Sequence, residues 1–390
     1  MSLTPHLTGW AHTRFGKSDL PDVEALMAEV SIAAVRDAGL DPQDLDAVSV
    51  GVFGTDITRQ RFDAALVGTG APELASVPAV RSENACATGS AALYAAFDMV
   101  EAGRARAVLV VGAEKMTRTP GDAVTDVLLG AAHLPSEGEF GSFPAVFAWL
   151  ARRYSERYGD PRRALSRIAA KNHRNGVANP YAHLRRDLGV EFCSTVSERN
   201  PLVADPLLRT DCSLVSDGAA AVVVTTPDVA ATARRAVGVR SRVQANDPMA
   251  IVSRPDPLAL DAGRRAFRGA LHEAGVGLDG LDLIETHDCF TVAELLQYEA
   301  FGLAEPGKAS VLLDEGRTEP DGTLPVNVSG GLKAKGHPIG ATGVSQHVLA
   351  AMQLVGEAGD MQLARAYRAA VFNMGGAAVA NYATVLEGAR

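Results

Sequence analysis

Cys86 stands directly before a run of small residues that predicts a helix over 87–102. At the start of a helix, unpaired backbone N–H groups and the positive end of the helix dipole favour a thiolate. The neighbours Ala85, Ala87 and Gly89 are small enough to let a substrate approach closely. Cys86 is therefore a candidate nucleophile, and the alternative is a buried thiol with no chemical role.

A histidine lies in the glycine-rich segment NVSGGLKAKGHPIGATG, residues 327–343. His337 is held between a glycine and a proline, just before a second expected helix start, so its position should be rigid. An imidazole held in this way can act as a general base or as a hydrogen-bond donor. The alternative is a surface histidine in a flexible loop. Lys333 and Lys335 in the same segment either contact a phosphate or face solvent.

The segment ETHDCF, residues 285–290, carries His287 and Cys289 where an expected strand gives way to an expected helix. Ligands of α/β proteins bind at such strand ends. No CxxC or HxxxH spacing accompanies these residues, so the sequence predicts no metal site.

The segment VFNMGGAAVA, residues 371–380, reads as a strand, a Gly-Gly turn and a second strand. The backbone N–H groups of such a turn can stabilise an oxyanion. The alternative is a hairpin turn without a chemical role.

These motifs sit in a pattern of alternating helices and strands that occurs twice. A helix over 23–38 precedes strands over 47–52 and 107–112, and the last of these is uniformly apolar, as in a buried central strand. The order recurs later in the chain, which indicates a duplicated α/β unit; the alternative is coincidence in an alanine-rich sequence. The matching pairs are 34–52 with 270–288, 87–89 with 341–343, and 106–113 with 368–376.

Residues of about 114–210 separate the two copies and predict an inserted, partly helical loop domain. Within it, residues 150–186 hold ten Lys or Arg against two acids, although the whole protein is acidic. This basic segment either docks an anionic ligand such as a nucleotide phosphate or forms a solvated helix face.

Composition narrows the class of protein. The chain has 390 residues, 47% hydrophobic and 21% charged, as expected for a globular protein with two or three cores. A net charge of −9 argues against nucleic-acid binding, and no apolar run is long enough to span a membrane. The N-terminal segment lacks a signal-peptide core, which predicts a cytoplasmic location. The four cysteines (86, 193, 212 and 289) are spaced unlike a disulfide set or a metal site.

Taken in order, the four motifs resemble the thiolase superfamily over essentially the whole chain. The most specific element is N-x-x-G-G-x-x-A-x-G-H-P-x-G-A-x-G, which residues 327–343 match at every fixed position. SDGAAAVVV at 216–224 resembles the strand that closes the first half of these proteins. The resemblance implies a duplicated α/β fold in five α-β-α-β-α layers. Its N-terminal half would be 1–225, including the loop domain, and its C-terminal half 226–390.

Two departures from the common thiolase pattern place the chain in a particular branch. Residues 287–290 read H-D-C-F where common thiolases have N-E-A-F, and Asn373 stands in place of the cysteine of a C-x-G-G-G motif, the usual second cysteine of these proteins. The H-D-C-F version is similar to thiolases of the sterol-carrier-protein-x type. In that branch Cys289 would replace the missing acid/base thiol.

The resemblance implies an acyl-CoA acyltransferase that cleaves 3-ketoacyl-CoA, or runs the reverse Claisen condensation, through an acyl-enzyme on Cys86. His337 would be the base, His287 and His337 would donate to the thioester oxygen, and the N–H groups of Cys86 and Gly375 would stabilise the other oxyanion. Coenzyme A or acyl-CoA would be a substrate, with no tightly bound cofactor. Predicted contacts to CoA are Ser213, Gly330 and Lys333.

The expected assembly is a homodimer or a dimer of dimers. One alternative function is a C-acyltransferase, a condensing subunit or a retro-aldolase that works with a small OB-fold acyl-CoA-binding partner. Cys86 argues against the aldolase, which needs no acyl-enzyme. A second alternative, motivated by Asn373, is a non-catalytic acyl-CoA-binding or scaffold subunit, but the retained Cys86, His337 and Cys289 argue against it.

Overall fold

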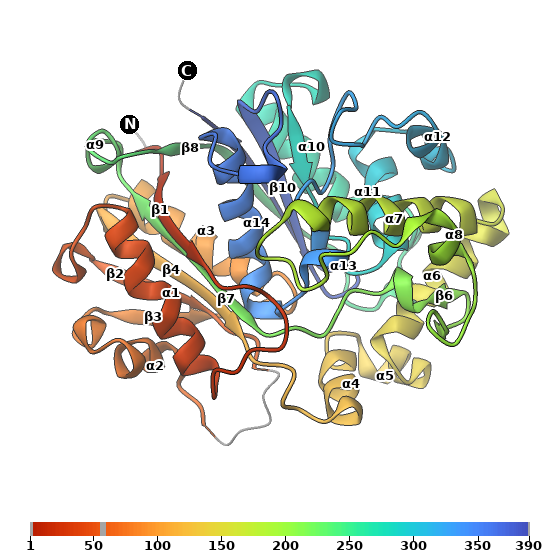
Figure 1. The fold of residues 1–390 in the computed structure, drawn as a ribbon, viewed down its shortest axis with the longest axis horizontal. Helices are drawn as coiled ribbons and strands as arrows, with labels where there is room; N and C mark the ends of the chain where they lie inside the picture. The colour runs from red at the N-terminus through yellow and green to blue at the C-terminus, as the bar shows by residue number, and fades with distance from the viewer. Residues whose placement is uncertain (1–2, 55–59, 389–390) are drawn as a thin grey trace.

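The computed structural model describes residues 3–54 and 60–388 (Figure 1). Its main strands are β1 (His6–His12), β2 (Ala47–Gly51), β3 (Ala79–Ser82), β4 (Ala107–Glu114), β7 (Gly218–Thr225), β8 (Val237–Asn246), β9 (Leu283–Glu285), β10 (Arg368–Gly375) and β11 (Ala380–Glu387), and β5 (Leu202–Ala204) and β6 (Leu207–Leu208) form a small hairpin. Its helices are α1 (Val23–Asp37), α2 (Asp63–Gly70), α3 (Thr88–Glu101), α4 (Gly121–Leu129), α5 (Leu134–Glu137), α6 (Phe143–Tyr158), α7 (Arg162–Ala178), α8 (Gly189–Ser194), α9 (Pro227–Ala230), α10 (Asp261–Ala274), α11 (Thr291–Phe301), α12 (Ala309–Asp314), α13 (Gly331–Lys335) and α14 (Ile339–Leu354).

The nine main strands form one sheet made of two halves with the same strand order. In the first half, β3, β2 and β4 are parallel, and β7 and β1 follow as antiparallel strands. In the second half, a single parallel bridge at Val326 takes the place of β3, and β9, β10, β11 and β8 follow in the same order and directions. A short β1–β8 pairing joins the halves. The duplicated unit predicted from the sequence is therefore present.

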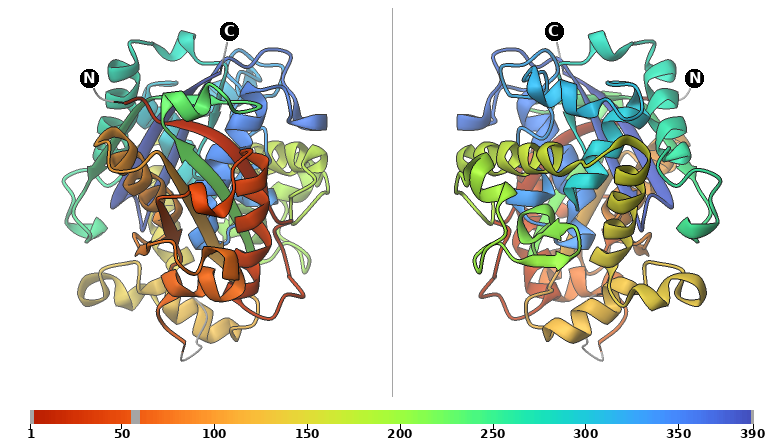
Figure 2. Two further views of the ribbon diagram at one scale, coloured as in Figure 1. Left: turned by 90° about the vertical axis from the view of Figure 1, so that its left-hand side faces the viewer. Right: turned by 90° about the vertical axis from the view of Figure 1, so that its right-hand side faces the viewer.

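Helices cover both faces of each half-sheet. The α1 helix packs outside β1, β4 and β7, and α10 packs outside β8 and β11. Between the half-sheets, α3 and α14 pack against each other and against strands of both sides (Figures 1 and 2). Three large apolar clusters fill the spaces between these five layers. This is the layered α/β fold expected from the sequence.

The contact between the first turns of α3 and α14 depends on glycine. A Cβ at Gly89 would lie 2.8 Å from Gly340 O, and a Cβ at Gly343 would lie 2.3 Å from Ser90 N. Both distances are below normal carbon contacts, so larger residues would push the helices apart. The repeated ATG sequence thus brings the start of α3, which carries Cys86, next to the start of α14, which His337 precedes.

The inserted segment follows the first-half strand β4 but packs on the second half. Its helices α6 and α7 contact α11, and α7 also contacts α12 (Figure 1). Their apolar side chains belong to the same cluster as those of α10 and α11. The order of elements along the chain did not predict this placement.

The basic segment 150–186 presents most of its charge to solvent, since seven of its ten cations are exposed, as expected for a solvated helix face. Most of its cations form ion pairs that tie the loop domain together or tie it to the second half. The pairs are Arg157–Asp256, Arg162–Asp211, Arg163–Asp314, Arg167–Asp314, Lys171–Glu294 and Arg174–Glu319. The buried Lys171–Glu294 pair therefore contributes to docking, whereas the exposed pairs contribute little. No helix among the described residues is long and apolar enough to cross a membrane.

Candidate active site

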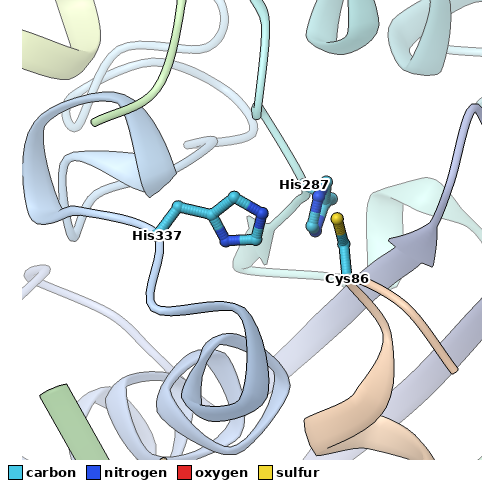
Figure 3. A group of neighbouring side chains, drawn as sticks. All are labelled: Cys86, His287 and His337. Atoms are coloured by element: carbon cyan, nitrogen blue, oxygen red, sulfur yellow. The ribbon is translucent and has the colours of Figure 1, made fainter. Parts of the chain in front are cut away.

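Three side chains from separate motifs converge at the carboxyl ends of the parallel strands. Cys86 Sγ and one ring nitrogen from each of His287 and His337 all lie within 4.8 Å of one another. Figure 3 shows the sulfur and the two rings facing one another from three different segments. The rings are nearly perpendicular, with centroids 5.0 Å apart. All three side chains are buried.

The hydrogen bonds of His337 fix which ring nitrogen is protonated. Thr342 Oγ1 donates its single proton to Pro338 O at 2.9 Å, so it accepts a hydrogen bond from His337 Nδ1–H at 2.6 Å. The other nitrogen, Nε2, then carries a lone pair, and it is buried without a partner. Burial and the charge of Lys335 lower the pKa of His337 to about 3, so the ring is neutral. A neutral imidazole with a free Nε2 lone pair has the form of a general base.

His287 is held from its opposite side by Asn373. The amide Nδ2 of Asn373 lies 2.8 Å from His287 Nδ1 and 3.2 Å from Cys86 O. Burial, followed by His337 and Lys335, lowers the pKa of His287 well below its ordinary value, so this ring is neutral too. Its Nε2 is also buried without a partner.

Cys86 does not start as the thiolate that its place before a helix suggested. Burial raises the pKa of Cys86 to about 12, although the backbone N–H groups of Gly376 and of Cys86 itself lower it. Desolvation of the charged form outweighs the stabilisation offered by the helix start. The resting pair is therefore a neutral thiol beside a neutral imidazole.

A backbone donor at the hairpin turn lies against the Cys86 sulfur. Gly376, with φ of +61°, supplies the N–H that interacts with Cys86 Sγ. Gly375 has a steric role, because a Cβ there would lie 2.4 Å from Asn84 O. The Gly-Gly pair in the sequence was a sufficient signal for the turn, but it did not determine which amide faces the sulfur.

A cavity of about 730 Å³ opens beside this cluster. Cys86, Cys289 and His337 line it together with side chains of α4, of the start of α6 and of the segment 203–215, most of them apolar. Burial, with Cys86 and Asp288, raises the pKa of Cys289 well above its ordinary value, so Cys289 is a neutral thiol that can give up a proton. Ser213 lies on the same wall, and its backbone N–H donates to Cys289 O at 2.8 Å.

Two of the three residues predicted to contact CoA lie elsewhere. The two are Lys333 and Gly330. Lys333 is buried, and its Nζ donates to Cys212 O. Lys335 of the same segment is also buried rather than solvated, and its Nζ donates to Ser345 Oγ at 3.0 Å. Gly330, with φ of +91°, packs against α7, where a Cβ would lie 2.6 Å from Gly176 Cα. Gly330 and Lys333 therefore shape the loop that carries His337 and do not line the cavity.

Asp288 links the H-D-C-F segment to the histidine loop. Its carboxylate accepts the backbone N–H of Leu332 at 2.6 Å and of Lys333 at 3.2 Å, and also Asn172 Nδ2 at 2.7 Å. These contacts fix the position of His287 and Cys289 relative to the loop that carries His337. Asn172 and Thr342 carry no signal of these roles in the sequence, because only the folded chain places their side chains beside these motifs.

The three clustered side chains could also hold a metal ion. A thiolate and two imidazoles are suitable ligands for Zn²⁺. A bound ion would, however, occupy the sulfur that a nucleophile must keep free.

The fold and this constellation define a thiolase-type α/β protein, and comparisons with known proteins agree. The thiolase N-terminal domain family matches residues 9–228, and the thiolase C-terminal domain-like family matches residues 243–388. The chain belongs to the thiolase family.

Curated relatives cover nearly the whole chain. It is 36% identical over 373 residues to an acetyl-CoA acetyltransferase of Methanothermobacter thermautotrophicus, which covers 94% of this chain and 95% of the relative. It is 31% identical to human sterol carrier protein 2 over 95% of this chain and 69% of that protein. The resemblance to the sterol-carrier branch is therefore confirmed.

Solved structures share the fold. An Ltp2-ChsH2(DUF35) aldolase has a TM-score of 0.80 at 21% identity, covering 100% of this chain and 99% of that one. Human mitochondrial 3-ketoacyl-CoA thiolase has a TM-score of 0.72 at 17% identity, covering 99% of each chain.

Proposed function

We propose that this protein is a thiolase-like acyl-CoA acyltransferase that transfers an acyl group between coenzyme A and a 3-ketoacyl-CoA through a Cys86 acyl-enzyme. The observation that carries the proposal is the buried group of Cys86, His287 and His337 beside a mostly apolar cavity. Curated relatives named acetyl-CoA acetyltransferase support the same reaction class.

In the cleavage direction, His337 Nε2 takes the proton of Cys86 as the sulfur attacks the 3-keto carbon. The proton moves with the attack because neither side chain is charged beforehand. The backbone N–H groups of Cys86 and Gly375, at the turn whose Gly376 N–H interacts with the sulfur, stabilise the oxyanion that forms on this carbon.

The C2–C3 bond then breaks, leaving the acyl group on Cys86 and the electron pair on C2 of the departing acetyl-CoA. The thiol of Cys289 protonates C2, while His287 and the now protonated His337 donate to the thioester oxygen that holds the enolate charge. In the second half-reaction, the Cys289 thiolate takes the proton of incoming CoA, whose sulfur attacks the acyl thioester. Acyl-CoA leaves, and Cys86 recovers its proton from His337.

The cavity supports an acyl chain longer than acetyl. Apolar side chains such as Val124, Leu128 and Phe143 line it together with the two cysteines, and its volume of about 730 Å³ exceeds what two carbons fill. We propose that Ser213 lies along the path of the CoA arm, because it lines the same cavity.

The proposed assembly is a homodimer in the cytoplasm. In the described part of the chain β3 lies at the edge of the sheet, paired only with β2, and its Val80 is 58% exposed. An open strand with an exposed apolar residue is suited to pairing with a second copy. A small partner protein remains an alternative, since the aldolase of similar fold is described with a DUF35 protein; a co-purifying small protein would favour it.

Incubation with acetyl-CoA followed by intact-mass measurement tests the acyl-enzyme. We expect one acetyl adduct on the wild type and none on Cys86→Ala, while Cys193→Ala, a buried thiol outside the cavity, should keep the adduct. Absence of the adduct on the wild type would remove the proposed mechanism and favour a binding subunit or an aldolase. Added Zn²⁺ should inhibit, and a chelator should not, because the sulfur must stay free.

A further inference from the structure

Asn373 occupies a position at which the chain departs from common thiolases, and it contacts the other departure, His287. Both side chains are fully buried. An amide can place either its donor or its acceptor toward a neighbour, so its orientation decides what it imposes on the imidazole.

The surroundings of Asn373 settle that orientation. Ser90 Oγ donates to Asn373 Oδ1 at 2.8 Å, and the carbonyl of Cys86 accepts from Nδ2 at 3.2 Å. The reversed amide would place its oxygen against the Cys86 carbonyl oxygen. The donor Nδ2 therefore also faces His287 Nδ1, which must accept.

The space for this arrangement is provided by a glycine. A Cβ at Gly343 would lie 2.6 Å from Asn373 Oδ1 and 2.5 Å from Ser90 Oγ. The second ATG repeat thus leaves room for the Ser90–Asn373 pair as well as for the contact between α3 and α14.

The geometry points to Asn373 as a positioning residue that holds His287 in the tautomer with Nδ1 unprotonated and Nε2 protonated. The protonated Nε2 is the buried atom that has no protein partner, and the ring that carries it lies beside Cys86 and His337 (Figure 3). Thr342 imposes the opposite tautomer on His337. The two neighbouring imidazoles therefore present one donor and one acceptor: His287 stabilises developing negative charge, and His337 removes the proton of Cys86.

This division of roles gives a physical reason for the two departures to occur together. The Nε2 of a neutral histidine at 287 can donate a hydrogen bond only if its Nδ1 is unprotonated and accepts one. An asparagine at 373 can donate to that nitrogen and to the Cys86 carbonyl at once, whereas a thiol has a single weak donor. The inference rests on the proposed function for its catalytic consequence, but the tautomer itself does not depend on the substrate.

The test is the ¹⁵N chemical shift of the ring nitrogens in histidine-labelled protein, with His287 assigned by a His287→Gln variant. In the wild type we expect protonated Nε2 and unprotonated Nδ1 at His287, and the reverse at His337. Asn373→Leu, similar in size but without a donor, should add a population of His287 with protonated Nδ1. It should also lower kcat by up to about 10²-fold, with KM nearly unchanged, as for the loss of one oxyanion donor.

Asn381→Leu is the matched control, since Asn381 is a buried asparagine on β11 that bonds only to backbone carbonyls. It should leave the signals of both histidines as in the wild type. If Asn373→Leu does not fold, Ser90→Ala frees the amide to rotate and should shift the same signal to a smaller degree. Protonated Nδ1 at His287 in the wild type, or an unchanged tautomer and kcat in a folded Asn373→Leu, would overturn the inference. Failure of Cys86 to take up acetyl from acetyl-CoA would instead count against the proposed function and leave the tautomer result standing.

Discussion

The protonation state of Cys86 gives a prediction that separates two kinds of thiol activation. With a pKa of about 12, only about 10⁻⁴ of Cys86 is thiolate at pH 8. An ordinary cysteine, with a pKa of about 8.5, is about a quarter thiolate at that pH. Cys86 in the free protein should therefore react with an alkylating agent on the order of 10³-fold more slowly than an ordinary thiol, apart from any effect of access.

The pH dependence removes the question of access, because burial slows the reagent equally at every pH. We expect the rate of iodoacetamide labelling at Cys86, followed by peptide mass spectrometry, to rise about tenfold per pH unit from pH 6 to 10 without a plateau. His337→Ala should show the same slope, since the resting histidine is neutral and carries no charge to stabilise a thiolate. A plateau with a midpoint below about pH 8 that is lost in His337→Ala would refute the reasoning and indicate a preformed thiolate–imidazolium pair.

Three further predictions concern the acid, the cavity and the docking of the loop domain. Cys289→Ala should lower the steady-state rate of 3-ketoacyl-CoA cleavage by about 10²–10⁴-fold, which is the contribution of a general acid. The acetyl adduct on Cys86 should still form in this variant, which would show that the nucleophile is intact. An unchanged turnover rate would refute the role of Cys289. Leu128→Trp narrows the cavity. For a series of 3-ketoacyl-CoA substrates of increasing length, each methylene that no longer fits should lower kcat/KM about fourfold, since burial of a methylene contributes about 0.8 kcal/mol. Values of kcat/KM equal to those of the wild type would mean that the acyl chain lies elsewhere. Lys171→Met leaves Glu294 buried without its cation, since the pair is 2.7 Å apart and at most 1% exposed, and should lower the free energy of unfolding by about 3–5 kcal/mol in denaturant titrations. Arg163→Ala, which breaks a solvent-exposed pair with Asp314, should cost less than about 1 kcal/mol, and equal losses in the two variants would contradict this account.

The neutral resting state of Cys86 and His337 also explains how burial favours the reaction at this site. A permanent thiolate would need solvation or a fixed cation, and either would compete with the substrate for the sulfur. Here the two histidines are neutral, and Lys335, which lowers the pKa of both, bonds to Ser345. Charge develops only when a carbonyl is present to receive it.

The sequence by itself determined the repeated order of elements and the residue types at the reacting centre. Apolar strands, small-residue helices and glycine turns are local signals, and they located the segments around Cys86, His287, Cys289 and His337 correctly. The duplication was visible because the two halves keep the same order of helix, strand, glycine-rich helix start and strand.

Only the tertiary structure decided what each group does in its surroundings. Burial reversed the expected ionisation of Cys86, because desolvation depends on neighbours that are distant in sequence. The same long-range packing placed the N–H of Gly376 at the sulfur and turned Lys333 inward. It also set Asn373 against His287, 86 residues apart in the chain. The direction of a hydrogen bond follows from which atoms meet in space, and spacing along the chain does not contain that information.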